Sequence, residues 1–162
     1  MNGDETIRVL GPEDSALYRR VRLRALADAP DAFGSLVADA ELKPDSLWQD
    51  QLRGPGPVVV STQDGEPVAM GGAFVGPDSA EARLWGMWTA PEARGHGHAT
   101  RVLAHLLAWC RARDLAVALD VTEGNDPARA LYVAHGFRPT GEWEPLREGS
   151  SLRAETMRLS DG

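Results

Sequence analysis

Residues 87–99 constrain the fold of this chain more than any other segment. An apolar run leads into them and ends at Pro91. A glycine-rich turn follows, and then a stretch with the apolar spacing of a long amphipathic helix. This order predicts a strand, a turn and a helix N-terminus, an arrangement that binds phosphate groups through backbone N–H groups and the helix dipole.

The run at residues 83–89 is apolar on both faces, so we expect a central strand covered on both sides. Strict alternation places Trp85 and Met87 on one face, and Leu84 and Trp88 on the other. Gly86 interrupts this pattern and suggests a bulge.

The turn carries two glycines, Gly95 and Gly97, which let the backbone approach a phosphate closely. Arg94 can add a charge-assisted contact. Two familiar phosphate loops match poorly. The P-loop requires a lysine and a hydroxyl residue where His98 stands, and the dinucleotide loop requires a third glycine. Residues 87–99 alone leave nucleotide, dinucleotide and coenzyme A ligands open.

A second segment, residues 121–137, places Asn125 at the end of a strand and Tyr132 about two turns into the following helix. By composition alone, Tyr132 is typical of a half-buried packing residue. Together the two segments resemble the GNAT superfamily of N-acetyltransferases. The matching positions of its acetyl-CoA motif are Pro91, Arg94, Gly95, Gly97 and Ala99. Those of its second motif are Asn125, Ala128, Leu131, Tyr132, Gly136 and Phe137.

The resemblance implies acetyl-CoA as co-substrate and direct acetyl transfer to an amine. It implies that the backbone of Met87, Trp88 and Thr89 pairs with the pantetheine arm, and that N–H groups near Trp88 stabilise the developing oxyanion. Asn125 is expected to bind the pantetheine directly or through water. The cofactor-binding set is completed by the following residues: Arg94, Gly95, His96, Gly97, His98, Ala99 and Tyr132.

Tyr132 is the implied catalytic residue, a general acid that protonates the departing thiolate. Tyrosine has an ordinary pKa of about 10 and is neutral at pH 7, so it can donate this proton. The sequence departs from the family pattern at Thr89, where an aliphatic residue is usual, and at His98. No glutamate stands in the central strand to act as general base. Glu123 or Glu81 acting through water remains open, as does an amine that arrives neutral.

Cys110 lies in the apolar stripe of the helix after the turn and is expected to pack in the core. His96 and His98 are only two potential ligands, with no carboxylate or thiolate at suitable spacing, so we expect no metal site. The single cysteine and the lack of an apolar segment long enough to cross a membrane favour a cytoplasmic protein that does not bind membranes. The net charge of −7 disfavours nucleic acid as a partner.

The acceptor amine is the open question. Aromatic candidates for its pocket are Phe33, Trp48, Trp85 and Trp143, each of which could equally be core. Glu144 and Glu155 could attract an amine, or could simply be solvated. The basic run at residues 18–24 is typical of a solvated helix face that pairs with nearby acids, and the alternative is contact with an acidic acceptor. A small molecule is the favoured acceptor. The alternatives are a protein or peptide amine, or a non-catalytic module that binds acyl-CoA.

The whole chain, residues 1–162, is predicted to form one domain. Its fold class is α/β (α+β), a mixed, mostly antiparallel sheet of about six or seven strands flanked by about four helices. The predicted order is β-α-α-β-β-β-α-β-α-β-β. Homodimers are common in the superfamily, so the resemblance also allows a homodimer.

Overall fold

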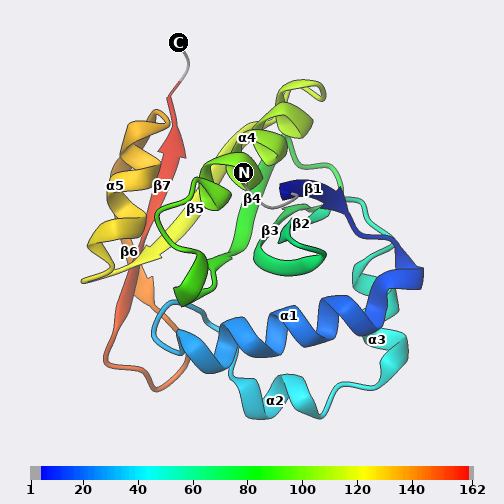
Figure 1. Ribbon diagram of the computed structural model, residues 1–162. Coiled ribbons are helices and arrows are strands. Elements are labelled where there is room, and N and C mark those ends of the chain that lie inside the picture. Colours follow the sequence, from blue (N-terminus) through cyan, green and yellow to red (C-terminus); the bar gives the residue numbers. More distant parts are fainter. Residues whose placement is uncertain (1–4, 161–162) are drawn as a thin grey trace.

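The computed structural model describes residues 5–160 and places one seven-stranded sheet between helices (Figure 1). The strands are β1 (Glu5–Val9), β2 (Val58–Gln63), β3 (Glu66–Val75), β4 (Glu81–Thr89), β5 (Ala116–Thr122), β6 (Phe137–Pro145) and β7 (Arg153–Leu159). The helices are α1 (Ser15–Asp28), α2 (Val37–Glu41), α3 (Asp45–Gln51), α4 (His98–Arg111) and α5 (Asp126–Ala134). Short 3-10 turns cover Pro12–Asp14 and Pro91–Ala93.

The sheet order is β1-β2-β3-β4-β5-β7-β6, and every pairing is antiparallel except that of β4 with β5. The predicted fold class and element order are confirmed. Helix α2 is an addition. Its five residues are too few to show a helical period in the sequence.

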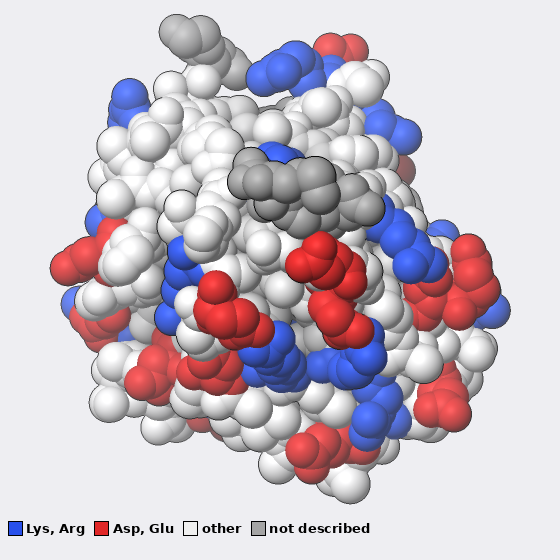
Figure 2. All heavy atoms as spheres, in the orientation of Figure 1, with Lys and Arg blue, Asp and Glu red and all other residues white. Residues whose placement is uncertain are grey.

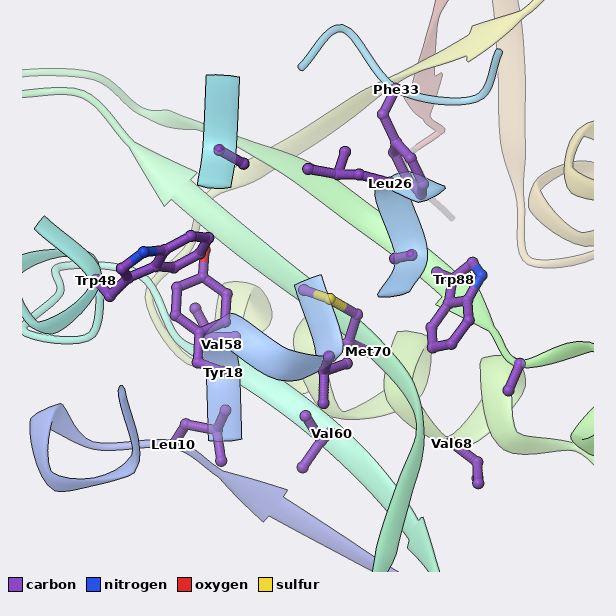
Figure 3. Close-up of a cluster of buried hydrophobic side chains, with 14 of the residues drawn as sticks. Leu10, Tyr18, Leu26, Phe33, Trp48, Val58, Val60, Val68, Met70 and Trp88 are labelled. Atoms are coloured by element: carbon purple, nitrogen blue, oxygen red, sulfur yellow. The ribbon is translucent and has the colours of Figure 1, made fainter. Parts of the chain in front are cut away.

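Two hydrophobic clusters lie on opposite faces of the sheet. The first packs α1, α2 and α3 against β2, β3 and β4, and Figure 3 shows Tyr18 of α1 beside Trp48 of α3 within it, with ring centroids 5.1 Å apart. The second packs α4 and α5 against the other face. The valines of β2 show why one strand serves both clusters: Val58 and Val60 join the first, while Val59 between them joins the second.

Strand β4 is central and packed on both faces, as predicted, but the predicted assignment of its side chains is wrong. Trp85 and Trp88 pack with the first cluster, whereas Leu84 and Met87 pack with the second. The cause is a bulge at Gly86, which has a φ of +67°. From Trp85 to Trp88, β4 advances three residues while β3 advances only two. The extra residue exchanges the faces on which the side chains beyond the bulge lie.

Charged side chains of both signs intermix over the lower half of the face drawn in Figure 2. Neither sign forms a continuous patch there. Among the described helices, none combines the length and apolar character needed to cross a membrane.

Candidate active site

The site begins where β4 and β5 separate. The two parallel strands pair only through their first residues, Glu81–Arg83 with Ala116–Ala118, and then diverge toward their carboxyl ends. Ligands of α/β sheets bind at such a position because the separated strands expose backbone groups and open a crevice. The gap can be followed between β4 and β5 in Figure 1.

A cavity of about 340 Å³ occupies this gap on the side of α4 and α5. It brings together residues from both motifs that are far apart in the sequence. Seven predicted cofactor-binding residues line it: Met87, Trp88, Thr89, Arg94, Ala99, Asn125 and Tyr132.

The glycine turn runs along one end of this cavity into α4. Gly95 and Gly97 both have a φ of +82°, and Gly97 is the N-cap of α4. A Cβ added at Gly95 would meet no heavy atom within 4 Å, so the backbone conformation, not crowding, favours glycine there. Gly95, His96 and Gly97 are exposed, and the first N–H groups of a helix have no partner within it. This geometry fits a pyrophosphate.

Arg94 is held beside the cavity by two contacts. Its Nε donates to the carbonyl oxygen of Thr89 at 3.1 Å, and its Nη2 donates to Asp28 at 2.9 Å. The same oxygen of Asp28 accepts a hydrogen bond from Nε1 of Trp88 at 2.9 Å. Asp28 at the end of α1 therefore fixes two of the predicted cofactor-binding side chains.

His98 differs from its neighbours in the turn because its side chain points into the protein. It is buried, and its Nδ1 lies 2.7 Å from the hydroxyl of Ser61 on β2. His96 stays at the surface. Within residues 5–160, no cluster of three or more histidine, cysteine, aspartate or glutamate residues is arranged to hold a metal.

Tyr132 lies at the inner end of the cavity, on α5. Its side chain is 6% exposed and packs edge-on against Phe137. Burial raises the pKa of Tyr132 to about 12, because the phenolate would lose its hydration. The hydroxyl is therefore protonated throughout the neutral range and can act as a proton donor. Asn125 lines the cavity nearby as the N-cap of α5, with its side chain not used in capping.

Beyond Tyr132, a narrow space of about 60 Å³ leads to a second and larger cavity. Tyr132, Asn125, Gly86 and Asp120 all line this passage. The larger cavity measures about 510 Å³ and is lined by side chains from both sides of the gap. Ala32 and Phe33 line all three spaces, so the loop after α1 runs beside the whole route.

The large cavity is closed on one side by a clasp between two loops. Nη2 of Arg147, between β6 and β7, donates to the carbonyl oxygens of Pro30 at 2.6 Å and Phe33 at 3.1 Å. A Cβ on Gly34 would come within 3.0 Å of the carbonyl oxygen of Leu146, so the loops touch closely. The clasp therefore joins the two loops that border this side of the large cavity.

The aromatic candidates for the acceptor pocket divide into two pairs. Phe33 and Trp85 line the large cavity. Trp48 is 1% exposed and packs in the first cluster, and Trp143, 37% exposed, lies beneath the guanidinium groups of Arg129 and Arg153.

The acidic candidates are likewise divided. Glu144 lines the large cavity, whereas Glu155 is buried in an ion pair with Arg129 at 2.9 Å. Glu81 pairs with Arg158, and Glu123 binds the backbone N–H of Arg153. Neither of these two proposed bases lines the cavities.

Sequence reasoning missed Asp120 as a residue of the site, and it offered Arg22 only as one member of the basic run that could contact an acidic acceptor. Asp120 accepts hydrogen bonds from Nη1 of Arg83 at 3.0 Å and from the hydroxyl of Thr156 at 2.8 Å. Its one signal in the sequence is a single acid within an apolar strand. Arg22 belongs to the basic run, whose members Arg20 and Arg24 form ion pairs at the surface, while Arg22 turns into the cavity.

Cys110 is fully buried in the second cluster, and burial raises the pKa of its thiol. The predicted packing role fits this position.

The sequence matches the model of the Acetyltransferase (GNAT) family over residues 23–137, a range that includes both motifs. No curated protein matches the chain.

Solved structures share the fold over nearly its whole length. A GNAT-family acetyltransferase from Streptococcus pneumoniae aligns with a TM-score of 0.80 at 18% identity, covering 96% of this chain and 98% of its own. A ribosomal-protein-alanine N-acetyltransferase from Brucella melitensis aligns with a TM-score of 0.77 at 21% identity, covering 94% and 98%. The yncA protein of Salmonella typhimurium, whose structure includes its cofactor acetyl-CoA, gives 0.75 at 17% identity, covering 98% and 95%.

Proposed function

Because the chain belongs to the GNAT family of acetyltransferases, we propose that it transfers the acetyl group of acetyl-CoA to the primary amine of a small molecule. Membership makes it an acetyl-CoA-dependent acyltransferase. The size and nature of the acceptor are our inference. The transfer is direct and takes place while the enzyme holds both substrates.

One observation carries the proposal: Tyr132 and Asn125 line both the cavity on the α4 side and the passage to the large cavity. A thioester placed at that passage is reached by an amine from the opposite side. The amine nitrogen adds to the acetyl carbon, the thioester oxygen takes up negative charge, and the carbon–sulfur bond breaks as the carbonyl re-forms. Tyr132 donates its proton to the departing sulfur, the proton released by the nitrogen passes to water, and Tyr132 regains a proton from water.

The residues on the α4 side divide the binding of the co-substrate among them. The unpaired edge of β4 at Trp88 and Thr89 is suited to the amide groups of pantetheine. The backbone from Gly95 to Ala99 is suited to the pyrophosphate. The bulge at Gly86 leaves β4 backbone out of the ladder, which provides N–H groups for the negative charge that develops on the thioester oxygen.

The clasp formed by Arg147 favours a small acceptor. A pocket of about 510 Å³ bordered by two joined loops has the size of a small-molecule site. The rest of a peptide acceptor would have to leave the pocket past these loops. The alternative of a peptide acceptor draws on two structural neighbours, from Brucella melitensis and Escherichia coli, that are ribosomal-protein-alanine N-acetyltransferases.

A thiol-release assay tests the proposal. The protein is mixed with acetyl-CoA and a panel of small amines, amino acids and short peptides, and the free CoA thiol is measured. We expect turnover with at least one small amine. Turnover only with peptides would show that the acceptor is a peptide or protein amine. Tight acetyl-CoA binding without any turnover would indicate a non-catalytic module.

A further inference from the structure

Arg22 is a cation enclosed in the wall of the large cavity. It projects from α1, with its guanidinium carbon 5.0 Å from the ring centre of Phe33 and 5.3 Å from that of Trp85. Its Nη1 is buried and has no hydrogen-bond partner among residues 5–160. Buried polar groups of folded proteins are usually paired, so an exception at a cavity wall indicates a place for a ligand.

No carboxylate neutralises this cation within the part of the chain that the structure describes. The ion pairs of the neighbouring arginines on α1 join Arg20 to Glu66 and Arg24 to Glu92, both outside the cavity. The polar groups that interact with Arg22 are the hydroxyl of Tyr18, which donates to Gln51, and the cation Lys43. Burial lowers the pKa of Arg22, because the charged guanidinium loses hydration without gaining a counter-ion.

The unpaired nitrogen lies beside the transfer point. A Cβ built on Gly86 would lie 3.2 Å from Nη1 of Arg22, and Gly86 lines both the large cavity and the narrow passage. An anion bound to Nη1 would therefore be next to the place where the amine must arrive. Across the gap on β5, Asp120 lines the same two spaces with the opposite charge.

We infer that the acceptor is a small amine bearing a carboxylate on a nearby carbon, an α-amino acid in the simplest case, with Arg22 binding the carboxylate. This inference rests on the proposed function. A guanidinium and a carboxylate form short, charge-assisted hydrogen bonds, and the ring faces of Phe33 and Trp85 hold the guanidinium in place. Asp120 attracts the ammonium form of the amine as it approaches the passage.

The test compares acceptors that differ only in the carboxylate: leucine against 3-methylbutylamine, and glutamate against 4-aminobutyrate, which lacks its α-carboxylate. For at least one pair, we expect kcat/KM to be at least about tenfold higher for the α-carboxylated member. Arg22→Met should reduce this preference, chiefly by raising KM for the amino acid, and should change kcat/KM for the simple amine much less. Arg22→Lys, which keeps the charge, should restore part of the preference.

Arg20→Met is the matched control, because Arg20 lies on the same helix and pairs with Glu66 at the surface. It should leave every rate unchanged. Wild-type protein that prefers the simple amines would overturn the inference while leaving the proposed function intact. An equal loss with both members of a pair in Arg22→Met would overturn it as well, because it would indicate a structural role.

Calorimetry provides a readout that does not depend on turnover. Leucine and glutamate are titrated into wild-type and Arg22→Met protein saturated with CoA. Binding of at least one of them to wild type and loss of that binding in the variant support the inference, even if the thiol-release assay fails. Absence of binding of both to wild type overturns it.

Discussion

The two cavities joined by the passage at Tyr132 are built in different ways. The cavity that we propose for acetyl-CoA lies beside exposed backbone: the free edge of β4, two glycines with a φ of +82° and the N-terminus of α4. The large cavity is made of side chains from α1, the loop after it and four strands. A site formed by backbone groups can bind the same co-substrate while the side chains around it vary. A site formed by side chains can bind a different ligand when one residue changes.

Tyr132 lines the cavity on the α4 side and the passage to the large cavity, and its removal should have the largest effect. We expect Tyr132→Phe to lower kcat by about 100-fold or more, because the departing thiolate loses its proton donor. The KM for acetyl-CoA should change little. Steady-state kinetics of thiol release measure both constants.

Tyr18→Phe is the matched control for Tyr132→Phe. Tyr18 is the other tyrosine of the chain, and its hydroxyl donates to Gln51 at 2.6 Å in the first cluster. The Tyr18→Phe substitution should lower the free energy of unfolding by about 1 kcal/mol and leave kcat unchanged. Equal kcat for wild type and Tyr132→Phe would remove Tyr132 from the acid role.

The pH titration of tyrosine absorbance should also show a large effect. Both tyrosines are buried, and each has its pKa raised to about 12 by burial. The folded protein should therefore show little phenolate absorbance at pH 10 to 11, where the tyrosines of the chain unfolded in denaturant are half or more ionised.

The folded state binds more protons than the unfolded state between pH 10 and about 12, so stability should fall as the pH rises through this range. Denaturant unfolding at pH 9 and pH 11 measures the change. A folded protein that titrates near pH 10 would show that the tyrosines are solvated, and Tyr132 would then not lie at the closed end of the cavity.

Gly95→Ala tests whether the backbone alone forms the phosphate site. An alanine at a φ of +82° costs about 1–2 kcal/mol, so the free loop should relax and acetyl-CoA must restore it. We expect about tenfold weaker binding by calorimetry. Gly65→Ala is the control, because Gly65 has the same φ, also has no atom near its Cβ, and lies in the β2–β3 turn. If both variants bind acetyl-CoA as wild type does, the loop conformation does not matter for the cofactor.

Arg94→Met should have the smallest effect. Arg94 is 57% exposed, so its attraction for phosphate is weakened by water and salt. We expect acetyl-CoA to bind about two- to fivefold more weakly at low salt, with the difference vanishing near 1 M salt. Arg53→Met, which removes an exposed cation paired with Asp50, is the control. A difference that persists at high salt would show that Arg94 acts through packing.

The same contrast explains how far the sequence could predict the molecule. Strands and the long helices α1 and α4 have clear periods, and the order of elements that these periods predict agrees with the structure. The facing of Trp85 and Met87 was predicted wrongly. A glycine can indicate a bulge, but only the register with β3 shows which side chains it turns over.

Within the candidate site, most residues that line the cavity proposed for acetyl-CoA come from two contiguous motifs, which the sequence displays, and the others come from the loop after α1. Asp120 was not identified, and Arg22 was not distinguished from the other arginines of its run, because their significance depends on distant elements. A basic run on a helix does not reveal that Arg22 alone lacks a partner. Phe33 was an ambiguous candidate until the clasp of Arg147 placed its loop over the cavity.

Hydrogen–deuterium exchange with and without acetyl-CoA tests the division between the two regions most directly, because it needs no acceptor. The account predicts slower exchange of the amides of residues 95–101 when acetyl-CoA is added. Residues 141–146, beside the large cavity, should show no change. Protection of residues 141–146 without protection of residues 95–101 would place acetyl-CoA in the large cavity and contradict the proposed division.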